Sequence, residues 1–206
     1  MIRFKRFWVG VLVSFVLAIP LSGYAGSSLL VDDFEGVGGT TNRLGGLANT
    51  YVMDPSRALA VRSEQAHDGK GGLMIKYDKK LKGGPYDSGG WCGYYTLLKT
   101  HSKYLDATSY QAITFWVKGA TGEENFVVGV ADQHWDEVGD SVKSEPIGKY
   151  LPAGRLTTNW QKAVVPLSTF MVDMTKLAAL SICFEGSVLP GGEGKGTIFV
   201  DDIFLE

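Results

Sequence analysis

The feature that most constrains this chain is the way glycine divides it into short segments. Of the 27 glycines, 16 cluster at residues 36–46, 69–72, 83–90 and 191–196, where turns are expected. Between these turns no stretch carries an apolar repeat long enough for an amphipathic helix, and residues 168–176 favour only a short helical turn. A chain divided in this way is restricted to folds built from strands and turns.

Several segments between the turns have the composition of strands. Residues 73–78 alternate at period two, which is typical of a half-buried strand. Runs rich in β-branched and aromatic residues follow at 112–119, 126–132, 160–167, 180–185 and 197–206. Many short strands without helix-length segments predict two packed antiparallel sheets. The predicted fold class is therefore an all-β, two-sheet antiparallel sandwich of the jelly-roll type.

The first 25 residues have the pattern of a secretory signal peptide. A basic start is followed by an apolar run at 7–21 and by small residues around Ala25. The run is shorter than the ~18–20 residues that span a bilayer, which favours cleavage after Ala25 over a retained membrane anchor. The sequence predicts a secreted or periplasmic protein with one domain at residues 26–206 and no stable membrane insertion.

Charge and cysteine content narrow the partners and the chemistry. Residues 1–25 hold three of the 20 Lys and Arg and none of the 22 Asp and Glu, so the remainder is acidic. An acidic surface argues against nucleic acid as a partner. The two cysteines, Cys92 and Cys183, both lie in strand-like runs. Neighbouring strands would permit a disulfide, and otherwise they are two half-buried thiols.

Motifs spread along the chain resemble those of a known group of domains. They are found at residues 31–36 (VDDFEG), 42–46 (NRLGG), 90–96 (GWCGYYT), 113–119 (ITFWVKG), 160–161, 165–168 and 198–203 (IFVDDI). This order resembles the galactose-binding-like β-sandwiches, most closely the family 11 carbohydrate-binding modules and the related complex I intermediate-associated domain. The resemblance implies a concave sheet that holds a glycan and a structural calcium ion near the convex edge.

Three carboxylates are candidate calcium ligands. In an extended strand Asp33 and Glu35 project to one side, and Asp201 alternates with apolar residues as if drawn into the core. A buried carboxylate needs a partner, and a hard cation with oxygen ligands supplies one. The loop at 67–71 matches the family loop that donates backbone carbonyls to the ion. The same three carboxylates are also compatible with turn capping or with pairing to Arg and Lys.

The resemblance directs attention to aromatic residues near polar ones. A flat ring covers the apolar face of a sugar, and a few polar groups pair with its hydroxyls. Residues 132–137 (DQHWDE) place an aromatic among hydrogen-bonding groups where a strand ends. Trp116 and Trp160 are instead expected in the core. The predicted ligand-binding residues are Trp91, Tyr94, Asp132, His134, Trp135 and Glu185.

Catalysis has weaker support than binding. Asp132 and Glu185 could face each other as the acid pair of a glycosidase, but acids also hydrogen-bond sugar hydroxyls. The chain has no G-x-S-x-G, H-E-x-x-H or P-loop motif. The sequence therefore predicts an exported, non-catalytic module that binds a polysaccharide or other glycan. The alternative is a domain of the complex I intermediate-associated type with a protein partner, and a glycan-active enzyme is the least supported.

Overall fold

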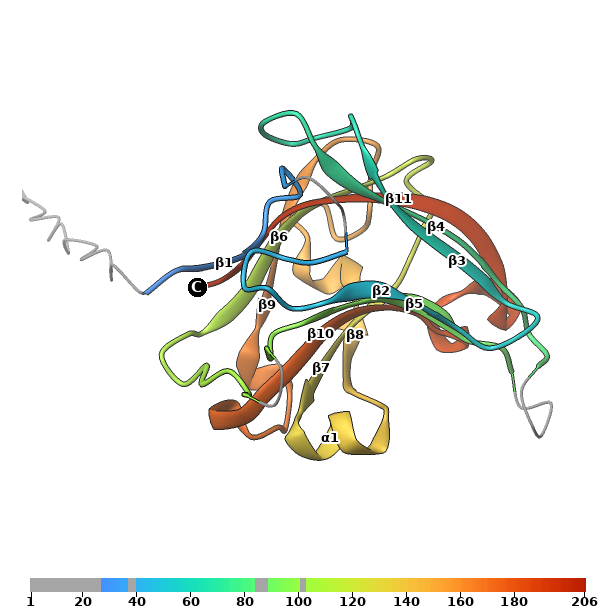
Figure 1. Cartoon of the computed structure of the whole chain (residues 1–206). Helices are drawn as coiled ribbons and strands as arrows, with labels where there is room; N and C mark the ends of the chain where they lie inside the picture. Colours follow the sequence, from blue (N-terminus) through green and yellow to red (C-terminus); the bar gives the residue numbers. More distant parts are fainter. Residues whose placement is uncertain (1–26, 37–39, 84–88, 101–102) are drawn as a thin grey trace, which may run out of the picture.

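The structure is a computed structural model that describes residues 27–36, 40–83, 89–100 and 103–206. The predicted signal peptide and its cleavage after Ala25 lie outside the described residues. Within the described part of the chain, no helix has both the length and the apolar character needed to cross a membrane. The described residues form two antiparallel sheets packed face to face, which confirms the predicted all-β sandwich (Figure 1).

The larger sheet has six strands, and its order is β3-β4-β11-β6-β9 with β1 added beside β11. β11 is the longest strand: its first part pairs with β4 and its last residues pair with β1, so both ends of the described chain meet there. The strands of this sheet are β1 (Leu29–Asp32), β3 (Arg57–Ser63), β4 (Gly72–Lys79), β6 (Ala112–Gly119), β9 (Gln161–Pro166) and β11 (Gly194–Leu205).

The smaller sheet has five strands in the order β2-β5-β10-β7-β8. Figure 1 shows both sheets curving in the same sense, with the five-stranded sheet on the inner side of the curve. We call its outer surface the concave face, and the outer surface of the six-stranded sheet the convex face. The strands are β2 (Ala48–Val52), β5 (Cys92–Leu97), β7 (Val127–Asp132), β8 (Val142–Pro146) and β10 (Leu177–Phe184).

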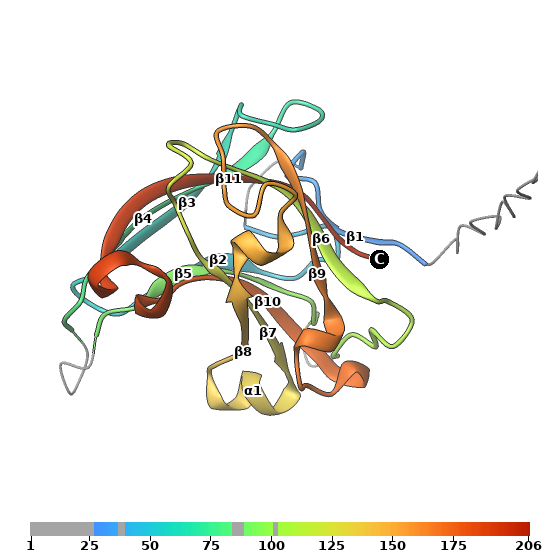
Figure 2. The ribbon, with the colours of Figure 1, turned by 180° about the vertical axis from the view of Figure 1, so that it is seen from behind.

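Helical structure is confined to the ends of the sandwich. The helix α1 (Gln133–Val138) connects β7 to β8 at one end of the five-stranded sheet, as seen from both sides in Figures 1 and 2. The short helical turn expected at 168–176 appears as two separate 3₁₀ turns. The 3₁₀ turns are η1 (Ile147–Tyr150), η2 (Leu167–Thr169), η3 (Met174–Lys176), η4 (Gly186–Val188) and η5 (Pro190–Gly192).

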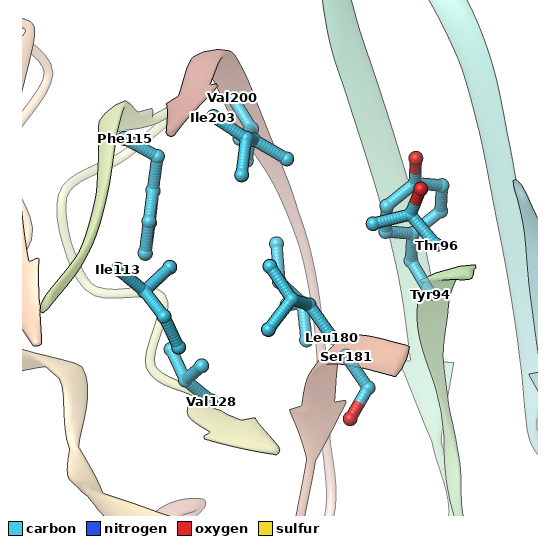
Figure 3. A pocket seen from close by; sticks show the side chains of 10 residues that line it. Tyr94, Thr96, Ile113, Phe115, Val128, Leu180, Ser181, Val200 and Ile203 are labelled. Atoms are coloured by element: carbon cyan, nitrogen blue, oxygen red, sulfur yellow. The ribbon is translucent and has the colours of Figure 1, made fainter. Parts of the chain in front are cut away.

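The core fills the space between the two sheets. Alternate residues of the central strands point inward, for example Ile182 and Phe184 on β10 and Ile198 and Val200 on β11. An apolar cavity of about 20 Å³ remains between the sheets, enough for about one water molecule. Figure 3 shows the Tyr94 ring beside it, whereas the Ser181 hydroxyl turns away from it toward the concave face.

Candidate functional site on the concave face

The strand register places large side chains beside glycine and other small residues on the concave face. In one row, Tyr51 of β2 lies opposite Gly93 of β5, which lies opposite Cys183 of β10. In the next row along the strands, Tyr95 lies opposite Ser181, which lies opposite Gly129 of β7. The two glycines leave room for side chains that reach across the sheet from neighbouring strands.

The Tyr51 ring uses the space above Gly93, and the Trp91 ring lies next to it. A Cβ on Gly93 would lie 2.4 Å from the Tyr51 hydroxyl oxygen and 2.6 Å from its Cζ atom, so the ring rests directly over the glycine. The Trp91 ring lies 5.9 Å from the Tyr51 ring, with 48° between their planes. Trp91 is 41% exposed. We call Trp91 and Tyr51 the aromatic platform; Tyr51 is a residue that the sequence analysis did not identify.

Glu185 lies at the same end of the concave face as the platform. It follows β10 directly and is half-buried. Burial is the largest cause that raises the pKa of the Tyr51 hydroxyl, and the neighbouring Cys183 and Glu185 side chains raise it further. The Glu185 carboxylate gives this end a hydrogen-bond acceptor next to flat apolar rings. The structure thus places Trp91 and Glu185, both predicted, near Tyr51.

Tyr94, another predicted ligand-binding residue, lies in the core. Its side chain is 3% exposed and lines the cavity between the sheets. Residues three apart on a strand point to opposite faces, so Trp91 and Tyr94 cannot share one. The prediction for Tyr94 is therefore corrected: its neighbour Tyr95, half-buried and opposite Ser181, faces the concave side instead.

Asp132 has a structural function at the start of α1. One carboxylate oxygen accepts from the Trp135 backbone N–H at 3.0 Å and caps the helix, and the other accepts from the Asp173 N–H at 2.7 Å. Both carboxylate oxygens of Asp132 therefore already accept backbone hydrogen bonds, and the residue is buried. The stretch predicted to be a loop with binding residues is thus a capped helix.

His134 and Trp135 lie on α1, away from the platform. His134 is exposed and Trp135 half-buried, and their rings meet edge to face at 5.5 Å. Asp136 of the same helix contacts Lys99 and accepts a hydrogen bond from the Tyr104 hydroxyl at 3.3 Å, which ties α1 to the segment after β5. A surface recess of about 220 Å³ lies beside α1, lined by Asp132, Gln133, His134, Glu137, Asp173 and Lys176.

The acid pair that the glycosidase alternative would require is not formed by Asp132 and Glu185. Asp132 lies opposite Leu177 at the start of β10, whereas Glu185 follows its end. Eight residues of extended strand separate these points by about 26 Å, since a strand rises ~3.3 Å per residue. The two carboxyl groups of a glycosidase lie within about 10 Å of each other. Asp132 and Glu185 therefore cannot act together on one glycosidic bond.

The three predicted calcium ligands are each occupied by hydrogen-bond donors. Asp33 forms an ion pair with Arg43 at 2.7 Å. Glu35 accepts from the backbone N–H groups of Lys70 and Gly71, both at 2.6 Å. Asp33 and Glu35 thus pair in the ways that the sequence analysis left open as the alternative to metal binding.

Asp201 completes the same pattern from the other end of the chain. It is fully buried and accepts from the His67 N–H at 2.7 Å, and burial raises its pKa above the usual value. The loop at 67–71 therefore presents N–H donors to these carboxylates, whereas calcium requires oxygen ligands. Among the described residues, no three His, Cys, Asp or Glu side chains are grouped so that they could hold a metal ion. The residues as arranged do not fit calcium, which stays a prediction without support from these contacts.

The two cysteines are free thiols on opposite faces of one sheet. Cys92 lies opposite Phe184 and points into the core, while Cys183 lies opposite Gly93 and points to the concave face. Antiparallel neighbours in this register cannot bridge, because their side chains leave the sheet in opposite directions. The strands are neighbours, as a disulfide requires, but the register excludes the bond.

A second group of rings covers part of the convex face. His67 stacks on Trp116, with ring centres 3.6 Å apart and 9° between the planes. The Lys118 ammonium lies 4.9 Å from the centre of the Trp160 ring and 5.2 Å from that of Phe199. We call these five residues the convex cluster. Trp116 and Trp160 were predicted to be core residues; they are half-buried on the outer surface instead.

The two-sheet fold and the aromatic platform define a β-sandwich module of the carbohydrate-binding class, and comparison with known proteins agrees. The sequence matches the family model described as carbohydrate binding domain 30 over residues 34–206. The chain therefore belongs to this family. A comparison with curated proteins found no match. The predicted resemblance to carbohydrate-binding sandwiches is confirmed, and the complex I alternative is not favoured.

Two solved structures show how closely the fold is shared. The family 30 module of the cellulosomal cellulase Cel9D-Cel44B of Clostridium thermocellum is 18% identical, with a TM-score of 0.61 over 86% of this chain and 97% of that chain. The family 11 module from Clostridium thermocellum, in complex with a β-1,3-1,4-mixed-linked tetrasaccharide, is 14% identical, with a TM-score of 0.61 over 88% and 96%. At these identities the likeness establishes the fold alone.

Proposed function

We propose that the chain is an exported, non-catalytic module that binds a polysaccharide on its concave face. The observation that carries the proposal is the aromatic platform: Trp91 is exposed and Tyr51 lies across Gly93, so both present ring surface on the concave side of the sandwich. Rings of this kind cover the apolar face of a pyranose. Membership of a family of carbohydrate-binding domains supports the same class of ligand.

The polar groups around the platform suit a ligand rich in hydroxyls. Glu185 offers carboxylate acceptors at one side, and Asn49 and Tyr95 lie on the same face in the next row of the sheet. Gly129 and Ser181 on the central strands have small side chains or none, so they do not block the concave face beside Tyr95. An extended sugar chain needs this combination of flat rings and scattered hydrogen-bonding groups.

Affinity gel electrophoresis tests the proposal directly. The purified protein is run through gels that contain soluble β-glucans, xylans, mannans or pectins, and retardation by one class identifies the ligand. A mixed-linkage β-1,3-1,4-glucan is the first probe, because a module of the same fold was solved with such a tetrasaccharide. Free migration in all four classes would contradict polysaccharide binding and direct attention to a protein partner.

Variants locate the site within the fold. Trp91→Ala is expected to lower the affinity measured from the retardation by tenfold or more, while the melting temperature changes little. Exposed aromatic anchors carry much of the binding energy at an interface. Trp160→Ala is the matched control, since it removes the same side chain from the convex face. Trp135→Ala tests how far the ligand extends: a loss of affinity equal to that of Trp91→Ala would place α1 within the site.

A further inference from the structure

A line of hydrogen bonds crosses the concave face toward the platform. It begins at the Lys143 ammonium, which donates to Asp140 Oδ1 at 2.7 Å and to the Ser141 hydroxyl at 2.8 Å. An ammonium group can only donate, so the Ser141 oxygen accepts there and its own proton is free for Ser181, whose oxygen lies 3.4 Å away. The Ser181 oxygen in turn lies 3.2 Å from the sulfur of Cys183.

The line ends at Cys183, in the same row of the sheet as Tyr51. Gly93 lies opposite Cys183, and the Tyr51 hydroxyl lies over Gly93, so the hydroxyl and the sulfur are neighbours on the concave face. Cys183 has no exposed surface, and burial raises the pKa of its thiol, as it does that of Tyr51. Both groups are therefore neutral at neutral pH, with the sulfur as a fixed acceptor in the central strand of the sheet. Among the described members of this line, Cys183 is the one that lies in the same row of the sheet as Tyr51 and Gly93.

Two glycines make this line geometrically feasible. A Cβ on Gly129 would lie 2.2 Å from the Ser181 hydroxyl oxygen and 2.5 Å from that of Ser141, and Gly93 provides the corresponding space for Tyr51. The line thus passes over Gly129 and extends from β8 to β10, with Tyr51 of β2 beyond it across β5. Glycine at both positions leaves the space that the hydrogen-bonded side chains occupy on this face of the sheet.

We propose that Cys183 is a positioning residue of the glycan site: its sulfur anchors the Tyr51 hydroxyl and so fixes the plane of the ring beside Trp91. The inference rests on the proposed function. Without the sulfur, the hydroxyl would lose its partner above Gly93, and the ring would turn outward to hydrate it, since an unpaired buried donor is costly. The platform would then lose its flat ring surface although both aromatic residues remain.

Near-ultraviolet circular dichroism tests the anchoring without any ligand. Two rings 5.9 Å apart at 48° give a coupled signal that depends on their mutual orientation, and its disappearance in Trp91→Phe identifies the band. Cys183→Ala is expected to change this band, as Tyr51→Phe does. Cys92→Ala is the matched control, because it makes the same substitution on the neighbouring strand but on the core side. A band unchanged in Cys183→Ala overturns the proposal.

A double-mutant cycle in binding tests the consequence. With mixed-linkage β-1,3-1,4-glucan as probe, Cys183→Ala and Tyr51→Phe are each expected to lower affinity about three- to tenfold, the effect of one hydrogen bond. The double variant is expected to lose no more than either single one, because both remove the same contact. Additive losses overturn the proposal, and so does unchanged affinity in Cys183→Ala. Cys92→Ala is expected to bind as the wild type does.

The two hypotheses fail in different ways. If the wild type does not bind the glucan, polysaccharide binding fails for that glycan, and the dichroism band still decides whether Cys183 holds Tyr51. If the wild type binds and Trp91→Ala does not, while Cys183→Ala keeps both its affinity and its band, the platform stands and the positioning function of Cys183 is rejected.

Discussion

The platform on the concave face and the convex cluster are both groups of aromatic rings on outer sheet surfaces, yet they differ in what covers the rings. In the convex cluster, His67 stacks on Trp116, and Lys118 lies over the other two rings. In the platform, Trp91 and Tyr51 meet at a tilt, and Trp91 remains 41% exposed. Outward-facing aromatics therefore indicate a ligand site only where ring faces are uncovered.

The sharpest way to break this comparison is to fill the space beneath the platform. Gly93→Ala is expected to lower the free energy of unfolding by about 3 kcal/mol and to abolish glucan binding, because the new Cβ would lie 2.2 Å from the Ile182 carbonyl oxygen and 2.4 Å from the Tyr51 hydroxyl. Urea denaturation measures the first effect and affinity electrophoresis the second.

Gly129→Ala is the matched control for this prediction. Its Cβ would meet two serine hydroxyls rather than backbone, and these can rotate away, so a loss of only about 1 kcal/mol is expected. Equal losses in the two variants would mean that the backbone contact at Gly93 does not decide the effect.

Removing a ring from the convex cluster sharpens the comparison. Trp116→Ala is expected to lower the free energy of unfolding by about 2 kcal/mol, since it removes a half-buried ring and its stack with His67, while glucan affinity stays unchanged. Urea denaturation and electrophoresis on the same preparation separate the two quantities. Weakened binding at unchanged stability would show that the convex face also takes part in recognition.

Chelation is expected to have the smallest effect. Because Asp33, Glu35 and Asp201 are bound by N–H donors and Arg43, excess EDTA should shift the melting temperature by less than about 1 °C, which corresponds to under ~0.5 kcal/mol for a chain of this size. Differential scanning calorimetry measures the shift, with calcium added back as the control. A fall of several degrees that calcium reverses would reinstate the predicted metal site.

The alternation of apolar and polar residues predicted where the strands lie but not which strands pair. The alternation at 73–78 and the apolar runs at 112–119 and 197–206 coincide with β4, β6 and β11, because burial of one face produces period two directly in the sequence. Tyr51 had no such signal: its importance comes from the pairing of β2 with β5, which joins residues more than 40 positions apart. Trp91 and Glu185 were predicted from their local sequence, and the structure places both at the same end of the concave face.

The errors in the predicted site have local physical causes. Tyr94 was placed beside Trp91 although residues three apart on a strand face opposite ways. Asp201 is fully buried as expected, but it was also expected to share a face with Ile203 and Leu205. A bulge between Asp201 and Phe204 resets the alternation, and Asp202 takes a φ of 50° there. Asp132 was read as a ligand where it caps a helix of only six residues, too short to leave an amphipathic signal.

The side chains of Cys92 and Cys183 leave the sheet on opposite faces, so whether they can form a disulfide depends on whether β5 and β10 have already paired. A disulfide between them is incompatible with the pairing of β5 and β10, so it can form only in chains in which these two strands have not yet paired. Once the strands have paired, the Cys92 thiol lies in the core and the Cys183 thiol is buried opposite Gly93 on the concave side. Under oxidising conditions, the rate at which β5 and β10 pair therefore decides what fraction of chains reaches the native sheet. The remaining chains form a disulfide that prevents this pairing.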